Sequence, residues 1–505
     1  MRKNVIIALL LAAMLLPSLA SCGESNTTTE TTPTTSGDTQ TTNTKKETTA
    51  AESRNAIDDE LPDSDFGGKE FIVLGAAAAT NPLEDFRGFV IADELTGEIV
   101  NDAVYNRNLN IADRFNTVIG YEAPGSTYED TCAFIKKAVT AGEPDAFHLA
   151  SFHVVSNGTL VNQGYYMNWY DVPHIDFSKP WWSDSTVNDL TENGRCFLAV
   201  GDAAVSSVSQ TYCMLVNKTK LANYDVPNVY DSVREGKWTL DYIQQITDGM
   251  SQDLNGDGKM DDNDFFGFGS NFASNTNAYL WAFDHMIFQR NDEGKLEFTY
   301  YDEKLVNIVE KLYNVFVEDT NVYCPTVATG SVQAHNMALE QFKLSRCVFI
   351  NALLSQTITY MSEMEDVYGI LPYPKYDENQ AEYKTMVDGN HEAMAIGKNV
   401  VDLDFIGTIT EALCAESFKQ VLPAYYDVCL KSRYADEPDD AEMIELCVNS
   451  RVFDIGYVYD GWHGVSFYIQ NLIADRSKDI ASYYAKNEKA ATQHYEEVLD
   501  MFYED

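Results

Sequence analysis

The stretch FGGKEFIVLG, residues 66–75, decides the fold class because it predicts the first buried strand. Its centre, 71–74, is a short apolar run closed by a glycine, which is typical of such a strand. Downstream, 98–115 and 128–142 have the apolar spacing of amphipathic helices, and 145–153 predicts another buried strand. This alternation of strands and helices predicts an α/β architecture with parallel strands.

The second half of the chain repeats the same two patterns. Helices are predicted at 238–250 and 302–316, and strands at 346–350 and 368–374. The chain has 505 residues, of which 45% are hydrophobic, so it holds enough apolar material for a large core. At roughly 100–200 residues per domain, two domains or two lobes are expected.

The charge of the chain is strongly negative. Asp and Glu together number 78 and Lys and Arg 35, so the formal net charge is −43. Such a surface repels nucleic acid and anionic lipid headgroups, and nucleic acid is therefore not an expected partner. A solvated acidic surface keeps a protein soluble but does not identify what it binds.

The N-terminus predicts export and lipidation. Two basic residues precede an apolar run at 5–16 that is too short to span a bilayer comfortably. The sequence LASC at 19–22 resembles the lipobox of bacterial lipoproteins, which implies a signal peptide at 1–21 and diacylation of Cys22. An ordinary secretory peptide with an incidental cysteine is the alternative.

A polar segment follows the proposed anchor. Residues 26–53 are rich in Thr and Ser and have no apolar period, so they cannot bury surface. We therefore predict a disordered tether over 22–65, which would hold a folded domain near the membrane. The expected location is the extracellular face of the bacterial cell membrane.

The stretch DLNGDGKMDDND, residues 253–264, has the spacing of a calcium loop. Calcium takes about six to eight oxygen ligands, and the loop needs a glycine at its sharp turn. The predicted ligands, at loop positions 1, 3, 5, 7, 9 and 12, are Asp253, Asn255, Asp257, the Lys259 carbonyl, Asp261 and Asp264. Because glutamate is usual at the last position, a weaker site is expected. With no second loop, a structural calcium is favoured over a sensor or docking module; an acidic surface turn is the alternative.

Local signatures of catalysis are missing from the sequence. There is no GxSxG, HExxH, phosphate loop or GxGxxG, and the eight cysteines after Cys22 have no CxxC spacing. Those cysteines could form disulfides or remain buried thiols. We expect a protein that is not an enzyme, although the many carboxylates leave a glycosidase pair open.

The aromatic content suits a sugar ligand. Phe, Trp and Tyr make up 12% of the chain. Flat aromatic faces stack on the C–H faces of pyranose rings, while carboxylates and amides bind the hydroxyl groups.

Several segments carry a resemblance to a known family. They are TGEIVNDAVYNRNLNIADRFN (96–116), PWWSDSTVNDLTENGRCFLAVGD (180–202), LVNKTKL (215–221), VYDSVREGKWTLDYI (229–243), ALEQFKLSRCVFI (338–350) and YGILPYPKYD (368–377). In this order they resemble the extracellular solute-binding proteins of family 1, the maltose-binding-protein-like lipoproteins of ABC sugar importers. Leu344 stands where these proteins usually have glycine, which weakens one match. The resemblance covers about residues 66–505.

The resemblance implies a two-lobed, type II periplasmic-binding-protein-like fold with a hinge and a ligand cleft between the lobes. Lobe 1 would comprise 66–205 plus 388–430, and lobe 2 would comprise 206–387 plus 431–505. The closed form would engage the permease subunits of an ABC transporter. A carbohydrate, and an oligosaccharide in view of the large lobes, is the expected ligand. A surface polysaccharide hydrolase and an adhesion lipoprotein are the alternatives.

Candidate cleft residues follow from positions at strand ends, near the proposed hinge and in polar aromatic loops. Open α/β sheets bind ligands at the carboxyl ends of their strands. The candidates are Phe152, His153, Trp181, Trp182, Asp202, Asn271, Trp281, Asn351, Asp388, Trp462 and His463. For each of them a structural or surface role is the alternative.

Overall fold

Two main sheets organise the protein in the computed structural model, which describes residues 50–76, 86–325, 331–431, 438–461 and 464–503. The strands are β1 (Lys69–Leu74), β2 (Thr117–Glu122), β3 (Leu149–His153), β4 (Tyr212–Asn217), β5 (Phe266–Gly269), β6 (Phe288–Arg290), β7 (Leu296–Phe298), β8 (Val322–Tyr323), β9 (Cys347–Leu353), β10 (Tyr368–Leu371), β11 (Thr385–Met386), β12 (Glu392–Ala395) and β13 (Arg451–Val452). The first sheet has the order β12-β3-β1-β2 and the second β10-β4-β9-β5-β8, while β6 pairs with β7 and β11 with β13. The predicted α/β class is confirmed.

Helices surround both sheets. They are α1 (Ala50–Asn55), α2 (Arg87–Val90), α3 (Ile99–Phe115), α4 (Tyr128–Ala141), α5 (Val154–Asn162), α6 (Asp184–Asn188), α7 (Ser206–Ser209), α8 (Lys218–Leu221), α9 (Val229–Arg234), α10 (Leu240–Thr247), α11 (Ser274–Asn277), α12 (Tyr279–Ala282), α13 (Glu303–Tyr313), α14 (Ser331–Lys343), α15 (Leu354–Thr359), α16 (Leu403–Glu416), α17 (Leu422–Lys431), α18 (Pro438–Asn449), α19 (Ile455–Val458), α20 (Tyr468–Ala474) and α21 (Ile480–Tyr503). Within the described ranges, none of these helices combines the length and apolarity needed to cross a membrane.

Local sequence explains the first strand–helix units. The apolar run predicted at 71–74 lies in β1, which pairs in parallel with β2 and β3. Helix α4 begins at a capping box, in which the Thr127 hydroxyl accepts from the Asp130 amide and the Asp130 carboxylate accepts from the Thr127 amide. It ends at Gly142, whose φ of 66° is the left-handed conformation that favours glycine. The sequence patterns therefore begin and end these elements close to where they were predicted.

The predicted parallel pairing holds for only part of the sheets. Strands β1, β2 and β3 are parallel, as are β5, β8 and β9. Strand β12 joins β3 in the antiparallel direction, and β4 is antiparallel to both β9 and β10. Both sheets are therefore mixed: the edge strand β12 is reversed in the first, and the interior strand β4 is reversed in the second.

The folded part begins earlier than the predicted tether allowed. Residues 50–55 form α1, and the buried Asp59 carboxylate accepts hydrogen bonds of 2.6 and 2.9 Å from the Arg114 guanidinium of α3. Leu61 is buried in the same core cluster as β1. The prediction of disorder over 22–65 is thus wrong for 50–65, because one ion pair and one leucine anchor an otherwise polar segment.

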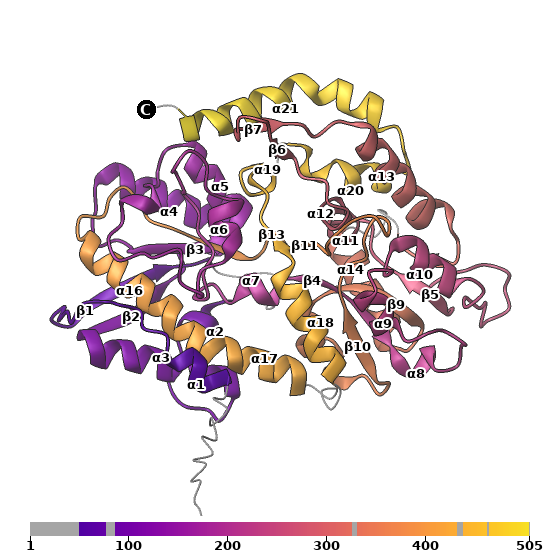
Figure 1. Cartoon of the computed structure of the whole chain (residues 1–505), viewed down its shortest axis with the longest axis horizontal. Coiled ribbons are helices and arrows are strands. Elements are labelled where there is room, and N and C mark those ends of the chain that lie inside the picture. The colour runs from indigo at the N-terminus through magenta and orange to yellow at the C-terminus, as the bar shows by residue number, and fades with distance from the viewer. Residues whose placement is uncertain (1–49, 77–85, 326–330, 432–437, 462–463, 504–505) are drawn as a thin grey trace, which may run out of the picture. The chain divides into compact units, whose positions relative to one another are not determined.

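Three chain segments run side by side between the two main sheets. Thr211 forms an antiparallel bridge to Val387, and β11 pairs in parallel with β13. Figure 1 shows α7, β11 and β13 between β3 on one side and β4 on the other. These are the segments by which the chain passes from one sheet to the other. The exact lobe boundaries stay a prediction.

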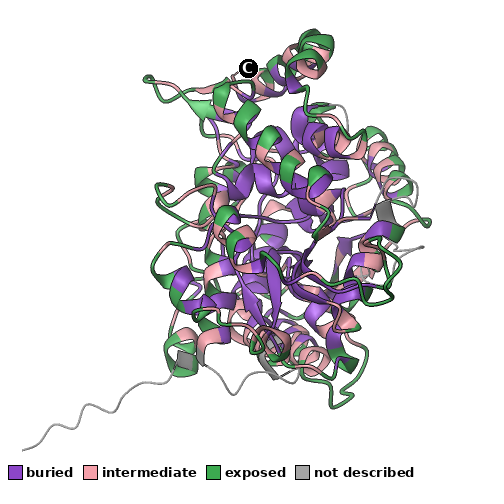
Figure 2. Cartoon of the chain, turned by 90° about the vertical axis from the view of Figure 1, so that its right-hand side faces the viewer, coloured by how far each residue is buried: buried purple, intermediate pink, exposed green. Residues whose placement is uncertain are grey.

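The strands form the interior of the molecule. Figure 2 shows buried residues along the strands and on the inner helix faces, and exposed residues on the outer helices and loops. Seven cysteines in the described ranges form no disulfide with one another, and five of them are buried. The buried-thiol interpretation therefore fits those five.

Candidate functional site

Strand β3 ends at a histidine that is held in its neutral form. The His153 ring caps α5, where its Nδ1 accepts a hydrogen bond of 3.1 Å from the Ser156 amide. The ring packs on Tyr128 with 4.4 Å between the ring centroids. Burial lowers the pKa of His153 to about 3, so the imidazole is uncharged at neutral pH.

A polar chain leads from β3 towards the second sheet. The backbone amide of Val154 donates to the His391 carbonyl, and His391 Nδ1 donates over 2.6 Å to the Asp388 carbonyl. Burial lowers the pKa of His391 to about 4, so the ring is neutral and its Nε2 is an acceptor. Among the described residues this Nε2 has no hydrogen-bond partner.

Asp388 connects this chain to β4. Its Oδ2 accepts a hydrogen bond of 2.5 Å from the hydroxyl of Tyr212, the first residue of β4. Its Oδ1 accepts from the backbone and side-chain amides of Asn390 at 3.1 and 2.8 Å. The charge of Asp388 also acts on the half-buried His335 ring, which places the two side chains in one electrostatic environment.

The ends of β5 and β9 supply two amides. The Asn271 side chain follows β5 and its Nδ2 lies 2.9 Å from His335 Nδ1. Gln356, in α15 just after β9, places its Nε2 2.5 Å from the other ring nitrogen of His335. Both main sheets thus contribute polar side chains to one buried group. We call it the strand-end cluster, and its members are His153, Tyr212, Asn271, His335, Gln356, Asp388 and His391.

The side chains of the strand-end cluster are of the kinds that bind a neutral, hydroxylated ligand. Asp388 is its only carboxylate, and the other members are amides, a phenol and histidines with lowered pKa values. Such groups bind hydroxyls as both donors and acceptors. The cluster contains no Ser, Cys or Lys nucleophile.

The structure brings three of the predicted site residues together. His153, Asn271 and Asp388 belong to the strand-end cluster. Asn351 lies in β9, and its fully buried side chain is hydrogen-bonded to the Tyr279 hydroxyl at 3.1–3.2 Å. Asn351 therefore has a structural role in this conformation.

Four aromatic predictions are corrected. Phe152 is 2% exposed and belongs to the main core. Trp181 and Trp182 are buried as well, and their indole N–H groups donate to Glu411 Oε1 and Oε2 at 2.7 and 2.9 Å. Trp281 is buried and donates to Asp454 over 3.0 Å. All four side chains are thus packed in the interior in this structure, which composition and loop position alone do not indicate, and none belongs to the strand-end cluster.

The remaining candidates lie elsewhere. Asp202 lines a separate cavity between α17 and α18 rather than the strand-end cluster. Trp462 and His463 lie outside the described residues.

The loop predicted to bind calcium is closed by its own hydrogen bonds. Asp253 accepts from the Gly256 and Gly258 amides at 2.6 and 2.8 Å, and the buried Asp264 accepts from the Leu254 and Asp261 amides at 2.9 and 2.8 Å. Among the described residues, no group of three or more His, Cys, Asp or Glu side chains is arranged to hold a metal. Both oxygens of the position-12 residue are thus engaged by backbone, and calcium stays a prediction.

Sequence reasoning missed Tyr212, His335 and Gln356. Tyr212 begins β4, one residue after the Thr211 bridge, where a strand enters from the crossover. His335 and Gln356 lie on α14 and α15, so they reach the cluster from helices and not from strand ends. A search restricted to the ends of strands cannot find them.

Fold and site together define a two-sheet α/β protein of the two-lobed binding-protein type. No protein-family model matches the chain, and no curated protein matches its sequence. Among solved structures, UspC of M. tuberculosis is similar with a TM-score of 0.53 at 12% identity, over 84% of this chain and 99% of UspC. Maltose-bound MalE3 of T. maritima is similar with a TM-score of 0.47 at 11% identity, over 86% and 99%. The similarity to UspC shows the fold, and the predicted two-lobed α/β architecture is confirmed.

Proposed function

We propose that the protein is a solute-binding protein that captures a carbohydrate at the strand-end cluster and delivers it to an ABC importer. The observation that carries this proposal is the set of hydrogen bonds that links the Val154 amide, just after β3, through His391 and Asp388 to Tyr212 at the start of β4. These bonds join strand ends from both sheets. A ligand bound there contacts both sheets at once, so its binding energy favours their approach. The similarity to UspC in fold supports the same reading.

A carbohydrate fits the cluster better than an ionic solute. One carboxylate among neutral amides, imidazoles and a phenol offers many hydrogen bonds but little net charge. Sugar hydroxyls match that set because each can donate and accept. An oligosaccharide is the form that we propose, and transfer to the permease would follow closure of the two lobes.

The proposed location is the outer face of the cell membrane. Support comes from the sequence alone, through the apolar run at 5–16 and the lipobox that ends in Cys22. These residues lie outside the described part of the structure.

A panel of mono- and oligosaccharides, amino acids and peptides tests the proposed function by thermal shift and titration calorimetry on the purified chain. We expect a carbohydrate to raise the melting temperature without being cleaved. Release of a hydrolysis product would favour a polysaccharide hydrolase. No stabilisation by any carbohydrate would contradict the proposal and favour an adhesion protein.

Replacing Asp388 by alanine should weaken binding of that carbohydrate about 10- to 100-fold. A charged hydrogen bond contributes about 1.5–3 kcal/mol, and each 1.4 kcal/mol is a factor of ten in affinity. Asp292→Ala, in an exposed loop, is the matched control and should bind as the wild type does. An unchanged affinity in a folded Asp388→Ala protein would show that the ligand binds elsewhere.

We also propose that the loop at 253–264 binds calcium as a structural ion. Its Asp253, Asn255 and Asp257 side chains are exposed and have free lone pairs beyond the backbone bonds that they accept. Chelation with EDTA should then lower the melting temperature, because an ion bound only to the native state stabilises it. Affinity for the carbohydrate at low temperature should hardly change. If EDTA leaves the melting temperature unchanged, the loop is an ordinary acidic turn.

A further inference from the structure

A second cavity, of about 450 Å³, lies away from the strand-end cluster, between α17 and α18. Its walls come from α1, the two helices, the Pro180–Asp202 region and β13. Figure 1 shows α1, α17 and α18 along the same edge of the molecule. The volume falls within the roughly 300–1,000 Å³ that is usual for small-molecule sites.

The floor of this cavity holds a carboxylate and a guanidinium that do not pair with each other. Among the described residues, the half-buried Asp202 carboxylate has no hydrogen-bond or ion-pair partner. The Arg451 guanidinium donates to Ser207 Oγ at 2.9 Å and to the Val448 carbonyl at 2.8 Å through Nη1 and Nε. Within the described ranges its Nη2 has no such partner.

Burial shifts the pKa values of both Asp202 and Arg451 towards their neutral forms. Burial raises the pKa of Asp202 to about 8, and the positive charges of Arg451 and Arg54 only partly oppose that rise. Burial also lowers the pKa of Arg451. Charged groups removed from water in this way are stabilised by a partner of opposite sign that hydrogen-bonds to them.

The lining also includes an apolar group of side chains, while Arg54, Tyr426, Glu445 and Asn449 add further polar atoms. Leu422 of α17 and Ile444 and Val448 of α18 are buried side chains on opposite walls, and Phe418 lies beside them. An aliphatic or aromatic side chain of a ligand would fill the space between the two helices, at about 25 cal/mol for each Å² of apolar surface removed from water.

We infer that this cavity binds a zwitterionic α-amino acid with an apolar side chain. Its ammonium group would lie against the Asp202 carboxylate, its carboxylate against Arg451 Nη2, and its side chain among Leu422, Ile444 and Val448. The guanidinium suits a carboxylate because its N–H groups form charge-assisted hydrogen bonds to such oxygens. A neutral sugar would bring no opposite charge to Arg451 or to the ionised form of Asp202, whereas a bound ammonium group would favour that ionised form. This site is independent of the carbohydrate site, since none of its residues belongs to the strand-end cluster.

Titration calorimetry of the purified full chain with L-leucine tests the inference. One leucine per chain is expected. Two analogues, 4-methylpentanoic acid without the ammonium and isopentylamine without the carboxylate, should each bind at least about tenfold more weakly, or about 1.4 kcal/mol. The variants Asp202→Asn and Arg451→Lys should show the same loss for leucine.

Control variants separate this site from the carbohydrate site. Asp388→Ala and the exposed-loop variant Asp292→Asn should both retain the wild-type affinity for leucine. Circular dichroism and thermal melting show that each variant is folded. Absence of any leucine binding to the wild-type chain would overturn the inference, as would equal binding of leucine and its two analogues. Full leucine affinity in folded Asp202→Asn protein would also place the amino acid elsewhere.

Discussion

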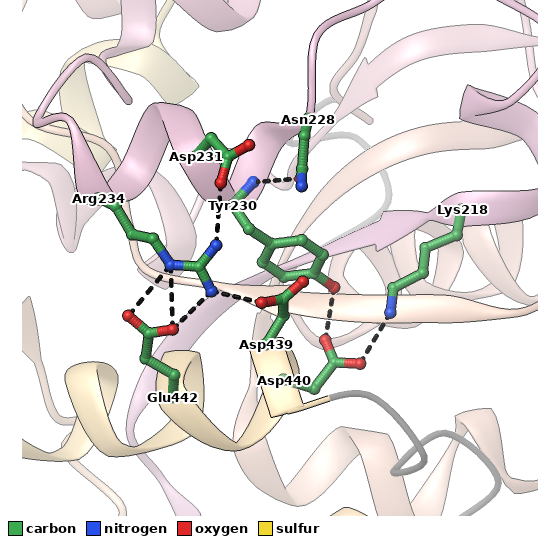
Figure 3. A network of polar contacts seen from close by, with 8 residues as sticks. All are labelled: Lys218, Asn228, Tyr230, Asp231, Arg234, Asp439, Asp440 and Glu442. Atoms are coloured by element: carbon green, nitrogen blue, oxygen red, sulfur yellow. Dashed lines mark hydrogen bonds and ion pairs between the residues drawn. The ribbon is translucent and has the colours of Figure 1, made fainter.

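Replacing Asp440 by alanine is expected to lower the free energy of unfolding by about 3–5 kcal/mol. Asp440 is the third residue of α18 and is 3% exposed. Its carboxylate accepts hydrogen bonds of 2.8 Å from Lys218 Nζ and 2.5 Å from the Tyr230 hydroxyl (Figure 3). It also accepts one of 3.1 Å from the Ile370 amide. Removing it breaks the ion pair with the half-buried Lys218 ammonium and the hydrogen bonds to Tyr230 and Ile370, and breaking a buried pair from one side is costly.

The neighbouring Asp439 provides a matched control on the same helix turn. Its carboxylate pairs with Arg234 at the surface, where Glu442 and Asp231 bind the same guanidinium (Figure 3). Asp439→Ala should therefore cost less than about 1 kcal/mol, as exposed and redundant ion pairs usually do. Urea unfolding of both variants measures the difference. Equal decreases in the free energy of unfolding would show that the hydrogen bonds of Asp440 to α9 and β10 do not stabilise the fold more than the surface ion pair of Asp439 does.

Sequence patterns predicted a helix or strand well where its buried residues form one apolar stripe along the helix or one continuous apolar run along the strand. The strand at 71–74 and the helices at 98–115 and 128–142 are examples, since apolar period and caps are local signals. The antiparallel strands β4 and β12 were not predicted, because the direction of pairing depends on which distant strand lies beside them. The order in which lobe segments alternate came from the family resemblance and not from periodicity.

The candidate site was predicted only in part. Asp388 was predicted because it lies near the proposed hinge and Asn271 because it lies in a polar aromatic loop, and both belong to the strand-end cluster. The surroundings of Trp181 and Trp182 could not be predicted, because two adjacent tryptophans near a loop have the same local sequence pattern whether they face a ligand or a buried carboxylate. Their acceptor, Glu411, lies more than 200 residues further along the chain, and no local pattern joins the three.

The buried Glu411 is the site of the second large expected effect on the free energy of unfolding. Replacing Glu411 by alanine should lower the free energy of unfolding by about 3–5 kcal/mol near pH 5. The side chain is fully buried in α16 and accepts the indole N–H groups of Trp181 and Trp182 at 2.7 and 2.9 Å. Alanine leaves both donors buried without an acceptor, and each such donor costs about 1–3 kcal/mol. Glu416→Ala is the control, because this half-buried residue on the same helix accepts only from Asn110 and Gln420 side chains near the surface and a lysine.

The pH dependence of this loss distinguishes a buried acid from a generic cavity. Burial raises the pKa of Glu411 to about 7, although both indole hydrogen bonds act to lower it. In the unfolded chain the Glu411 carboxyl has a pKa of about 4.5. Between about pH 4.5 and 7 the native state therefore holds a proton on Glu411 that the unfolded chain has released. Stability from Glu411 is therefore fully present below about pH 4.5 and declines by up to about 1.4 kcal/mol per pH unit as the pH rises to about 7. The difference between wild type and Glu411→Ala should narrow across that window in urea unfolding measurements. A difference that is constant from pH 5 to pH 8 would show that Glu411 ionises normally in the folded protein, and that its role is packing alone.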